Sequence, residues 1–363
     1  MAEPMNFYSL LVRGKDLTDE EYEHLSQVYT KYGREKIYQL VKGKKILPFA
    51  ARTFSACGLD VGYWQSCLDQ FRTRNRKILC CLNKAYENLQ QFGVKKMFVS
   101  ENFGALLSAG EDIGLFASGD VDNYADPSEK KKIYQAFEAL GYTRKERYSG
   151  HRQIAAEFFP PEDADVPEKF YISVDFYPLA RLKLPCFIEA DQFVAWDKAW
   201  RYADTSILLP PPDALMYICM LHISLHSFSR APDIRLYIDL LNMTKTQVDY
   251  ALIRQWCQRD HTCTRAAVAA ELANKLMKTQ IPDEVIQLSD RRVKIEKIVF
   301  NPVSNDLIYE PRGLKVLRIE ALCNDKGAIN GCLEILSPDK KWMKSVYGSS
   351  GLIAHMKHLV KVI

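Results

Sequence analysis

The segment from residue 62 to residue 92 constrains the fold most, because it contains no proline and repeats apolar side chains at helical spacing. The repeating side chains are Leu68, Phe71, Ile78, Leu79, Leu82, Ala85 and Leu89. Gly93 follows at a position where helices commonly end. Upstream, Thr18 and Glu21 have the spacing of a capping box, which marks a helix start. The sequence therefore predicts that residues 1–92 are helical and that one long helix closes this region.

After Gly93 the pattern changes to short β-prone runs separated by turn residues. Helices are predicted to begin at Gly104-Ala105 and at Asp126-Pro127, since proline at the first position of a helix costs little. Strands are predicted at residues 94–99, 116–124, 153–159 and 171–177, with an irregular hairpin loop at 160–167 between the last two. This region predicts a small mixed core of strands and helices.

From about Pro212 onward the chain is again predicted to be helical. The expected helices lie at residues 213–226, 233–241, 249–257, 266–277, 338–347 and 352–360. The predicted fold class is therefore α+β, with a small mixed β-sheet core flanked by N-terminal and C-terminal helical lobes. The predicted domains are a helical region at 1–92, an α/β core at 93–190 and a helical domain at 191–363.

Composition narrows the class of protein. The chain has 363 residues, a formal net charge of +4 and ten cysteines without a Cys-x-x-Cys pair, which indicates reduced thiols. No apolar run approaches the roughly 18 residues that a membrane helix needs, and no basic segment followed by an apolar run marks a secretory signal. We therefore expect a soluble, cytoplasmic protein with no membrane partner. The modest charge argues against a nucleic-acid partner and favours a small anionic substrate.

Asp120 and Asp122 form the most informative motif. In a strand, residues two apart point to one face, so both carboxylates project together while Val121 turns into the core. Two carboxylates side by side in an apolar strand repel each other, and a divalent cation between them removes that repulsion. Oxygen ligands of this kind suit Mg²⁺ or Mn²⁺. The motif therefore predicts a metal site.

A third carboxylate, Asp175, interrupts the apolar strand predicted at 171–177. If this strand neighbours the first, two metal ions about 3.5–4 Å apart could hold the attacking and leaving oxygens of a displacement at phosphorus. Asp175 would then act as the general base, or hold the metal that lowers the pKa of the acceptor hydroxyl. Glu157, in the strand predicted at 153–159, is an alternative third acid.

Gly104 and Ala105 lie between a predicted strand and a predicted helix. Backbone N–H groups at the start of a helix can hold phosphate oxygens. The segment is therefore a candidate phosphate-binding turn upstream of the acid pair.

The ordered set of Gly104-Ala105, Ser118-Gly119-Asp120-Val121-Asp122 and Val174-Asp175 resembles the DNA polymerase beta-like nucleotidyltransferase superfamily. More narrowly, most of the chain is similar to a family of uncharacterised nucleotidyltransferases found mostly in bacteria. The similar segments are Gly93-Val94, Gly141-Tyr142, Leu209-Pro210-Pro211-Pro212-Asp213, Leu221-His222 with His226, Arg235-Leu236-Tyr237-Ile238-Asp239, and Leu336-Ser337-Pro338-Asp339 with Met343 and Tyr347.

The resemblance implies transfer of a nucleoside monophosphate from an NTP such as ATP to a small-molecule or peptide acceptor, with release of pyrophosphate. It implies that Mg²⁺ (or Mn²⁺) is the cofactor. The implied metal-binding and catalytic residues are Asp120, Asp122 and Asp175. The implied nucleotide-binding residues are Gly104, Ala105, Ser118 and Gly119.

Two departures from the family pattern motivate a second hypothesis. The family usually has a lysine directly before the glycine of the turn, where Asn102-Phe103 stand here. It also tends to have an arginine shortly before the acid pair, where Leu115-Phe116-Ala117 stand. The alternative is therefore a catalytically weak or inactive relative that binds or regulates. A third hypothesis is modification of another protein or of an RNA end.

Two groups of residues that contain histidine could bind a metal or have a purely structural role. His222 and His226 share one helix face and could hold a metal together with Asp239, or could pack between helices. Arg235 and Asp239 have the spacing of a structural helix pair. The remaining group, Cys257 with His261 and Cys263, lacks a fourth zinc ligand.

Overall fold

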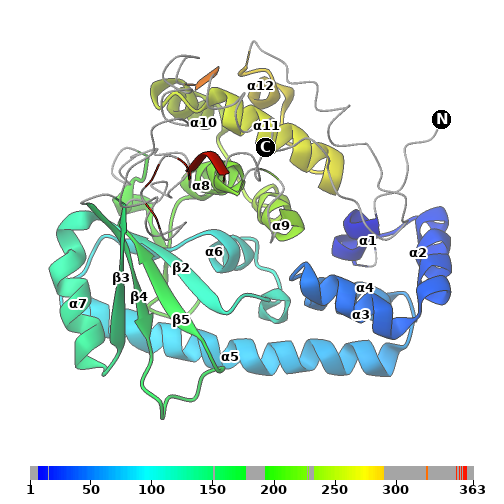
Figure 1. Cartoon of the computed structure of the whole chain (residues 1–363), viewed down its shortest axis with the longest axis horizontal. Coiled ribbons are helices and arrows are strands. Elements are labelled where there is room, and N and C mark those ends of the chain that lie inside the picture. The colour runs from blue at the N-terminus through cyan, green and yellow to red at the C-terminus, as the bar shows by residue number, and fades with distance from the viewer. Residues whose placement is uncertain are drawn as a thin grey trace.

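The computed structural model describes residues 7–14, 16–149, 152–176, 193–226, 228 and 233–289, with 324–325, 349, 351, 353 and 355–357 near the C-terminus (Figure 1). The helix predicted at 338–347 lies outside the described residues, and most of the one predicted at 352–360 does too. The described fold consists of helices, a mixed five-stranded sheet and a short two-stranded sheet formed by β6 (Trp200–Arg201) and β7 (Leu208–Leu209), in agreement with the expected α+β class. No described helix is long and apolar enough to cross a membrane.

The N-terminal part is helical, as predicted. Its helices are α1 (Phe7–Arg13), α2 (Asp19–Tyr32), α3 (Arg34–Gly43), α4 (Leu47–Ala56) and α5 (Val61–Gln91). The capping box at the start of α2 is confirmed, since the Thr18 hydroxyl accepts from the Glu21 N–H and the Glu21 carboxylate accepts from the Thr18 N–H. The long helix is also confirmed, and Gly93 follows it with φ 72°. α5 runs beneath both α4 and the sheet (Figure 1).

The sheet has the strand order β1-β2-β5-β4-β3. Its strands are β1 (Met97–Val99), β2 (Asp120–Ala125), β3 (Thr143–Ser149), β4 (Arg152–Phe159) and β5 (Tyr171–Asp175). β2 and β5 are parallel, and the other neighbours are antiparallel. The expected hairpin between β4 and β5 is present. The edge strand β3 was missed, because its sequence is mostly polar and an edge strand with a solvated face lacks a clear apolar pattern.

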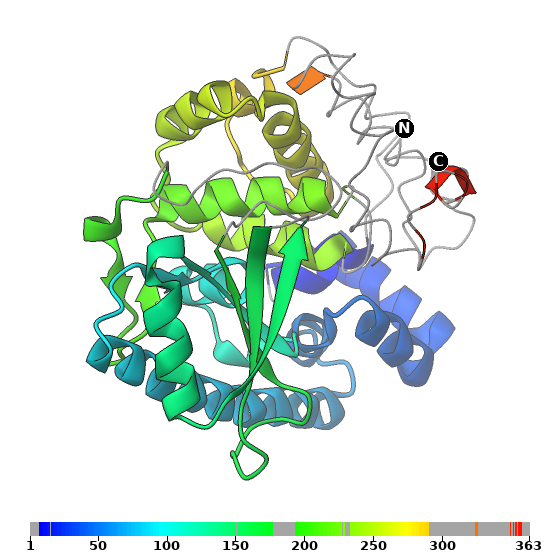
Figure 2. The same ribbon diagram turned by 60° about the vertical axis from the view of Figure 1, so that its left-hand side comes forward.

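One face of the sheet packs on α5 and on α7 (Lys130–Ala139), as the turned view in Figure 2 shows. On this face the Tyr86 hydroxyl donates to Asn123 Oδ1 at 2.8 Å, and the rings of Phe137 and Phe158 stack at 4.0 Å. Asn123 Nδ2 in turn donates to the carbonyl of Ser173 on the parallel strand. These contacts fix β2 against β5, so the opposite face presents the acidic side chains.

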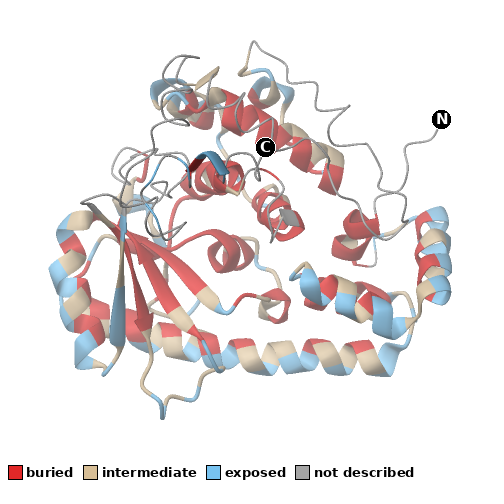
Figure 3. Cartoon of the chain, viewed as in Figure 1, coloured by how far each residue is buried: buried red, intermediate tan, exposed pale blue. Residues whose placement is uncertain are grey.

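The second face of the sheet meets α6 (Glu101–Ser108) and, beyond it, the C-terminal helices. These helices are α8 (Pro212–Leu225), α9 (Asp233–Met243), α10 (Tyr250–Arg259), α11 (Cys263–Met277) and α12 (Asp283–Ile286). Twelve residues of α8 are buried, which makes it the central helix of this lobe. Figure 3 shows the buried core running from β2 through α6 to α8, so the acidic face of the sheet lies toward the interior.

Candidate functional site

Asp120 and Asp122 lie on one face of β2, as predicted. Val121 between them is fully buried and points to the opposite face. Asp120 is half-buried at the first position of the strand, and Asp122 is 7% exposed. The chain therefore places two carboxylates side by side, one of them nearly removed from solvent.

The long helix α5 fixes the segment that leads into this pair. Asn75 Nδ2 donates to the carbonyls of Ile113 and Phe116, at 2.6 and 2.9 Å. The Arg74 guanidinium donates to the carbonyl of Ser118. Asn75 is fully buried, so the backbone before Asp120 is held from below by a helix distant in sequence.

Hydroxyl groups orient the Asp120 carboxylate. Ser118 Oγ donates to Oδ1 at 2.5 Å, and Tyr171 on β5 donates to Oδ2 at 3.0 Å. Burial acts to raise the pKa of Asp120. The two hydrogen bonds and the positive charges of Arg235 and Lys45 outweigh it, so the pKa of Asp120 lies below its ordinary value. Asp120 is therefore ionised at neutral pH.

Asp175 lies on the strand parallel to β2 and on the same face, as predicted. Its register partner is Tyr124, whereas Asp122 faces Ser173, so Asp175 lies two residues beyond the acid pair. Its Oδ1 is 3.5 Å from Arg147 Nη2, and the residue is 3% exposed. The structure thus brings the three aspartates to one face of adjacent strands, with Asp175 offset along the strand.

Glu157, the alternative third acid, also lies on this face. It faces Ser173 in the register, which places it in one row with Asp122 across β5. Its carboxylate lies 3.3 Å from Arg147 and 3.6 Å from Lys145. Arg147 therefore bridges the two candidates for the third acidic position.

The donor chemistry at Asp120 and Asp122 fits a hard divalent cation. Both side chains supply carboxylate oxygens from one strand face, which suits Mg²⁺ or Mn²⁺. Within the residues that the structure describes, no group of three or more His, Cys, Asp or Glu side chains converges on a metal position. The fit therefore rests on the Asp120 and Asp122 carboxylates, while Asp175 and Glu157 are both paired with Arg147.

The predicted position of the strand-to-helix turn at Gly104-Ala105 is wrong. α6 begins at Glu101, with Ser100 as its N-terminal cap, and the N–H of Gly104 is already bonded to the Ser100 carbonyl at 3.1 Å. Gly104 is needed for packing, because a Cβ there would lie 2.7 Å from the Val99 carbonyl oxygen. The sequence pattern predicted that Gly104 forms the turn between strand and helix. The turn instead lies at Glu101, which has φ 42°.

The true turn lies next to the acid pair. The N–H of Ser100 donates to the Asp122 carbonyl at 2.9 Å. The N–H of Asn102, in the first turn of α6, donates to the carboxylate of Asp239. A carboxylate of α9 therefore already occupies part of the helix N-terminus that was considered for a phosphate.

His222 and His226 lie together, with ring centroids 4.7 Å apart. His222 Nδ1 is 2.6 Å from Glu101 Oε2, and the Tyr124 hydroxyl donates to the other oxygen of Glu101. His222, Glu101 and Tyr124 are buried at the junction of β2, α6 and α8, whereas His226 is half-buried. Neither the histidines with Asp239 nor the group of Cys257, His261 and Cys263 forms a metal cluster in the described part of the chain.

Sequence reasoning missed two cations beside Asp120. Lys45 follows α3 and is exposed, while Arg235 on α9 is 7% exposed, and both charges act on Asp120. Arg235 was interpreted as half of a structural pair with Asp239, which is 3.5 Å away. The pairing is real, but only the fold shows that Arg235 also lies near the acid motif.

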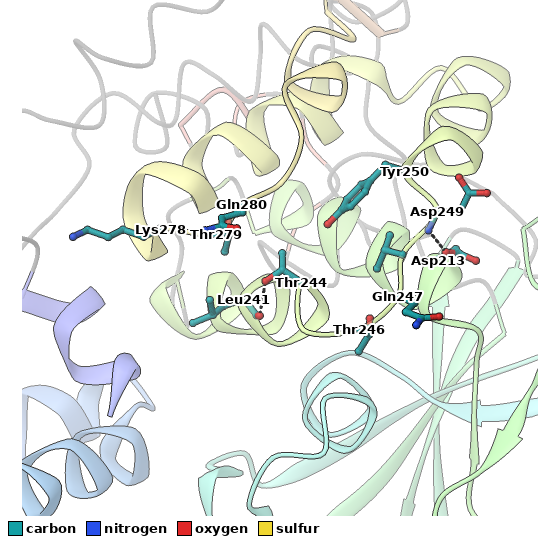
Figure 4. A pocket seen from close by; sticks show the side chains of 11 residues that line it. Asp213, Leu241, Thr244, Thr246, Gln247, Asp249, Tyr250, Lys278, Thr279 and Gln280 are labelled. Carbon is teal, nitrogen blue, oxygen red and sulfur yellow. Dashed lines mark hydrogen bonds between the residues drawn. The ribbon is translucent and has the colours of Figure 1, made fainter. Parts of the chain in front are cut away.

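A large open hollow lies elsewhere, in the C-terminal lobe (Figure 4). It measures about 810 Å³ between the α9–α10 connection and the end of α11. Several of its polar groups are satisfied internally: Thr246 Oγ1 bonds the Met243 carbonyl, and Asp213 accepts from the Asp249 N–H. The hollow contains none of the predicted site residues. We therefore assign the candidate chemistry to β2 and β5, where the carboxylates are.

Comparison of the chain with protein-family models, with curated proteins and with solved structures gave no match.

Proposed function

We propose that the protein is a metal-dependent nucleotidyltransferase. It transfers a nucleoside monophosphate from an NTP to a small-molecule or peptide acceptor and releases pyrophosphate. The observation that carries the proposal is the pair Asp120 and Asp122 on one face of a buried strand, with Lys45 and Arg235 close by. This combination provides ligands for a divalent cation and positive charge for a polyphosphate at one place. The sequence resemblance to the nucleotidyltransferase superfamily supports the same proposal.

Each residue has a distinct part in the proposed reaction. Asp120 and Asp122 would hold Mg²⁺ (or Mn²⁺), which supplies positive charge to the phosphate oxygens. Ser118 and Tyr171 keep the Asp120 carboxylate in one orientation through their hydrogen bonds. Asp175 accepts the proton of the acceptor hydroxyl, which requires it to exchange its contact with Arg147 for the acceptor.

The second candidate function is a non-catalytic protein of the same fold that binds or regulates. Two observations favour it. Arg147 neutralises Asp175 and Glu157, and Asp239 occupies the first turn of α6. Such a protein would bind an NTP without turning it over.

The test measures pyrophosphate release from each of the four NTPs with Mg²⁺ or Mn²⁺, with a small-molecule extract as the source of acceptor. Asp120→Asn and Asp122→Asn should each lower the rate by at least about a hundredfold, the scale of losing one preorganised electrostatic contact. Asp163→Asn, an exposed acid in the loop between β4 and β5, is the matched control and should keep the wild-type rate.

Thermal unfolding shows whether the variants remain folded. Equal pyrophosphate release by wild type and by both site variants would refute the proposed function. NTP binding by calorimetry without release under any of these conditions would favour the non-catalytic candidate.

A further inference from the structure

A small cavity lies beside the acid pair, between the N-terminal helices, α6 and α9. It measures about 10 Å³, room for about one water-sized group. Its lining residues are Lys45, Phe49, Asn102, Leu106, Leu115, Ala117, Arg235, Ile238, Asp239 and Asn242. Ala117 connects it to the site, because the next residue, Ser118, donates its hydroxyl to Asp120. The cavity is therefore adjacent to the proposed metal-binding carboxylates.

Two buried hydrogen-bond donors of this lining lack an acceptor among the described residues, and the Lys45 ammonium lies at the same cavity. Nδ2 of Asn102 and Nε of Arg235 are both buried and have no hydrogen-bond partner there. Both residues are 7% exposed. The ammonium group of Lys45, whose backbone N–H donates to the Lys42 carbonyl, makes neither a hydrogen bond nor an ion pair with a described residue, although Lys45 lines the same cavity. Buried donors are nearly always satisfied in folded proteins, so the two orphaned donors at this cavity call for an acceptor, and the exposed Lys45 ammonium adds positive charge there.

The missing acceptor should be an anion. Nδ2 of Asn102, the guanidinium of Arg235 and the ammonium of Lys45 are all donors, and two of these groups carry positive charge, which is the composition that binds a phosphate oxygen. The cavity volume admits one oxygen, and the rest of the anion would lie at the mouth, where Lys45 is exposed and Asp120 is near.

Asp239 also lines the cavity, with its Oδ2 3.5 Å from Arg235 Nη1. Burial raises the pKa of Asp239 to about 7; the charge of Glu101 adds to the shift, while Arg235 and the Asn102 N–H oppose it. Near neutral pH this carboxyl group therefore takes up a proton readily, and its repulsion of an anion is reduced.

We propose that Lys45, Asn102 and Arg235 form an anion subsite that holds an oxygen of a polyphosphate chain beside Asp120. The assignment rests on the proposed function and deepens it. Lys45, after α3, and Arg235, on α9, would supply the positive charge. This charge would replace the lysine and the arginine that the family pattern has near Gly104 and before Asp120. The N-terminal helical region then has a role in substrate binding through Lys45.

The test uses inorganic tripolyphosphate without metal and the full chain, with affinity measured by calorimetry. Lys45→Gln should weaken binding roughly tenfold, since one charge-assisted hydrogen bond is lost, and Lys45→Glu should weaken it further. Arg235→Lys keeps the charge and removes Nε, so it should also weaken binding. Lys42→Gln and Lys42→Glu, on the exposed side of α3, are the matched controls and should bind as wild type does. Lys45 is exposed, so its variants should fold normally.

Two outcomes overturn the proposal: no binding of tripolyphosphate by the wild type, or equal binding by wild type and both Lys45 variants. Nucleotide turnover separates this result from the proposed function. Tripolyphosphate binding that depends on Lys45, without any NTP turnover, would support the subsite and refute the transferase. NTP turnover with the same KM in wild type and Lys45→Gln would support the transferase and refute the subsite.

Discussion

Asp239 is a carboxyl group buried on α9, 4% exposed, where it accepts from the Asn102 N–H and lies next to Arg235. Burial raises its pKa to about 7, with Glu101 adding to the shift and Arg235 opposing it. The i,i+4 spacing of Arg235 and Asp239 was enough to predict their pairing. Their position beside α6 and Asp120 was not predictable, because it depends on how α9 packs against the core.

The raised pKa of Asp239 gives a pH-dependent stability. The folded state binds the proton more tightly than the unfolded state, whose pKa is near 3.8. The contribution of Asp239 to the free energy of unfolding therefore falls as pH rises from about 4 to about 7, and is constant above that range. Asp239→Asn removes this dependence. Relative to wild type, the variant should gain stability by up to about 1.4 kcal/mol per pH unit across this window.

Denaturant unfolding at several pH values between 4 and 8 measures this slope. Substitution of the exposed Asp163 by Asn is the control, and its free energy of unfolding should change with pH as that of the wild type does. A parallel curve for Asp239→Asn as well would contradict the prediction.

At the scale of elements, the connection of β1 to α6 positions the site. α6 packs so closely on the end of β1 that only a glycine fits at position 104. The sequence predicted a strand followed by a helix here. It could not show which of the residues 100–104 forms the turn, because Glu101 has no intrinsic preference for its positive φ and tertiary contacts impose it.

Gly104→Ala should destabilise the fold by about 1–3 kcal/mol. The new Cβ would lie 2.7 Å from the Val99 carbonyl oxygen, and the overpacking outweighs the gain in helix propensity of about 1 kcal/mol. Gly62→Ala in the first turn of α5 is the matched control, since nothing lies within 4 Å of its Cβ position. Chemical denaturation of both variants gives the comparison. Destabilisation of the two by the same amount would show that α6 has room beside β1.

At the scale of the whole molecule, Glu21 joins elements from opposite ends of the described chain. Its carboxylate contacts Arg13 at the end of α1, the Thr18 N–H before α2 and Lys278 after α11. Burial acts to raise the pKa of Glu21, but the hydrogen bonds from Arg13, Thr18 and Lys278 lower it to about 2. The N-terminal and C-terminal helices therefore meet at an ionised carboxylate.

The lowered pKa of Glu21 predicts acid sensitivity. This carboxylate contributes stability above about pH 4.5, and the contribution is lost as pH falls toward about 2. Glu21→Gln should cost about 1–3 kcal/mol at pH 7, the scale of hydrogen bonds to a charged group, and should flatten the acid limb of the stability curve. Lys278→Gln should reproduce the fraction of this stability loss that comes from the contact between Glu21 and Lys278. The exposed Glu20→Gln is the control. A Glu21→Gln variant with an unchanged acid limb would contradict the prediction.

The local sequence pattern alone determined several helices and strands of this protein and the side on which the acid pair lies. The capping box at Thr18, the long helix ending before Gly93 and the shared face of Asp120 and Asp122 follow from spacing, because helices and strands have fixed periods. The tertiary structure decided the rest. It placed Asp175 opposite Tyr124, since strand register is set by packing between segments about fifty residues apart. It also brought Lys45, which follows α3, and Arg235 on α9 close to Asp120, a proximity that depends on how helices far apart in sequence pack together.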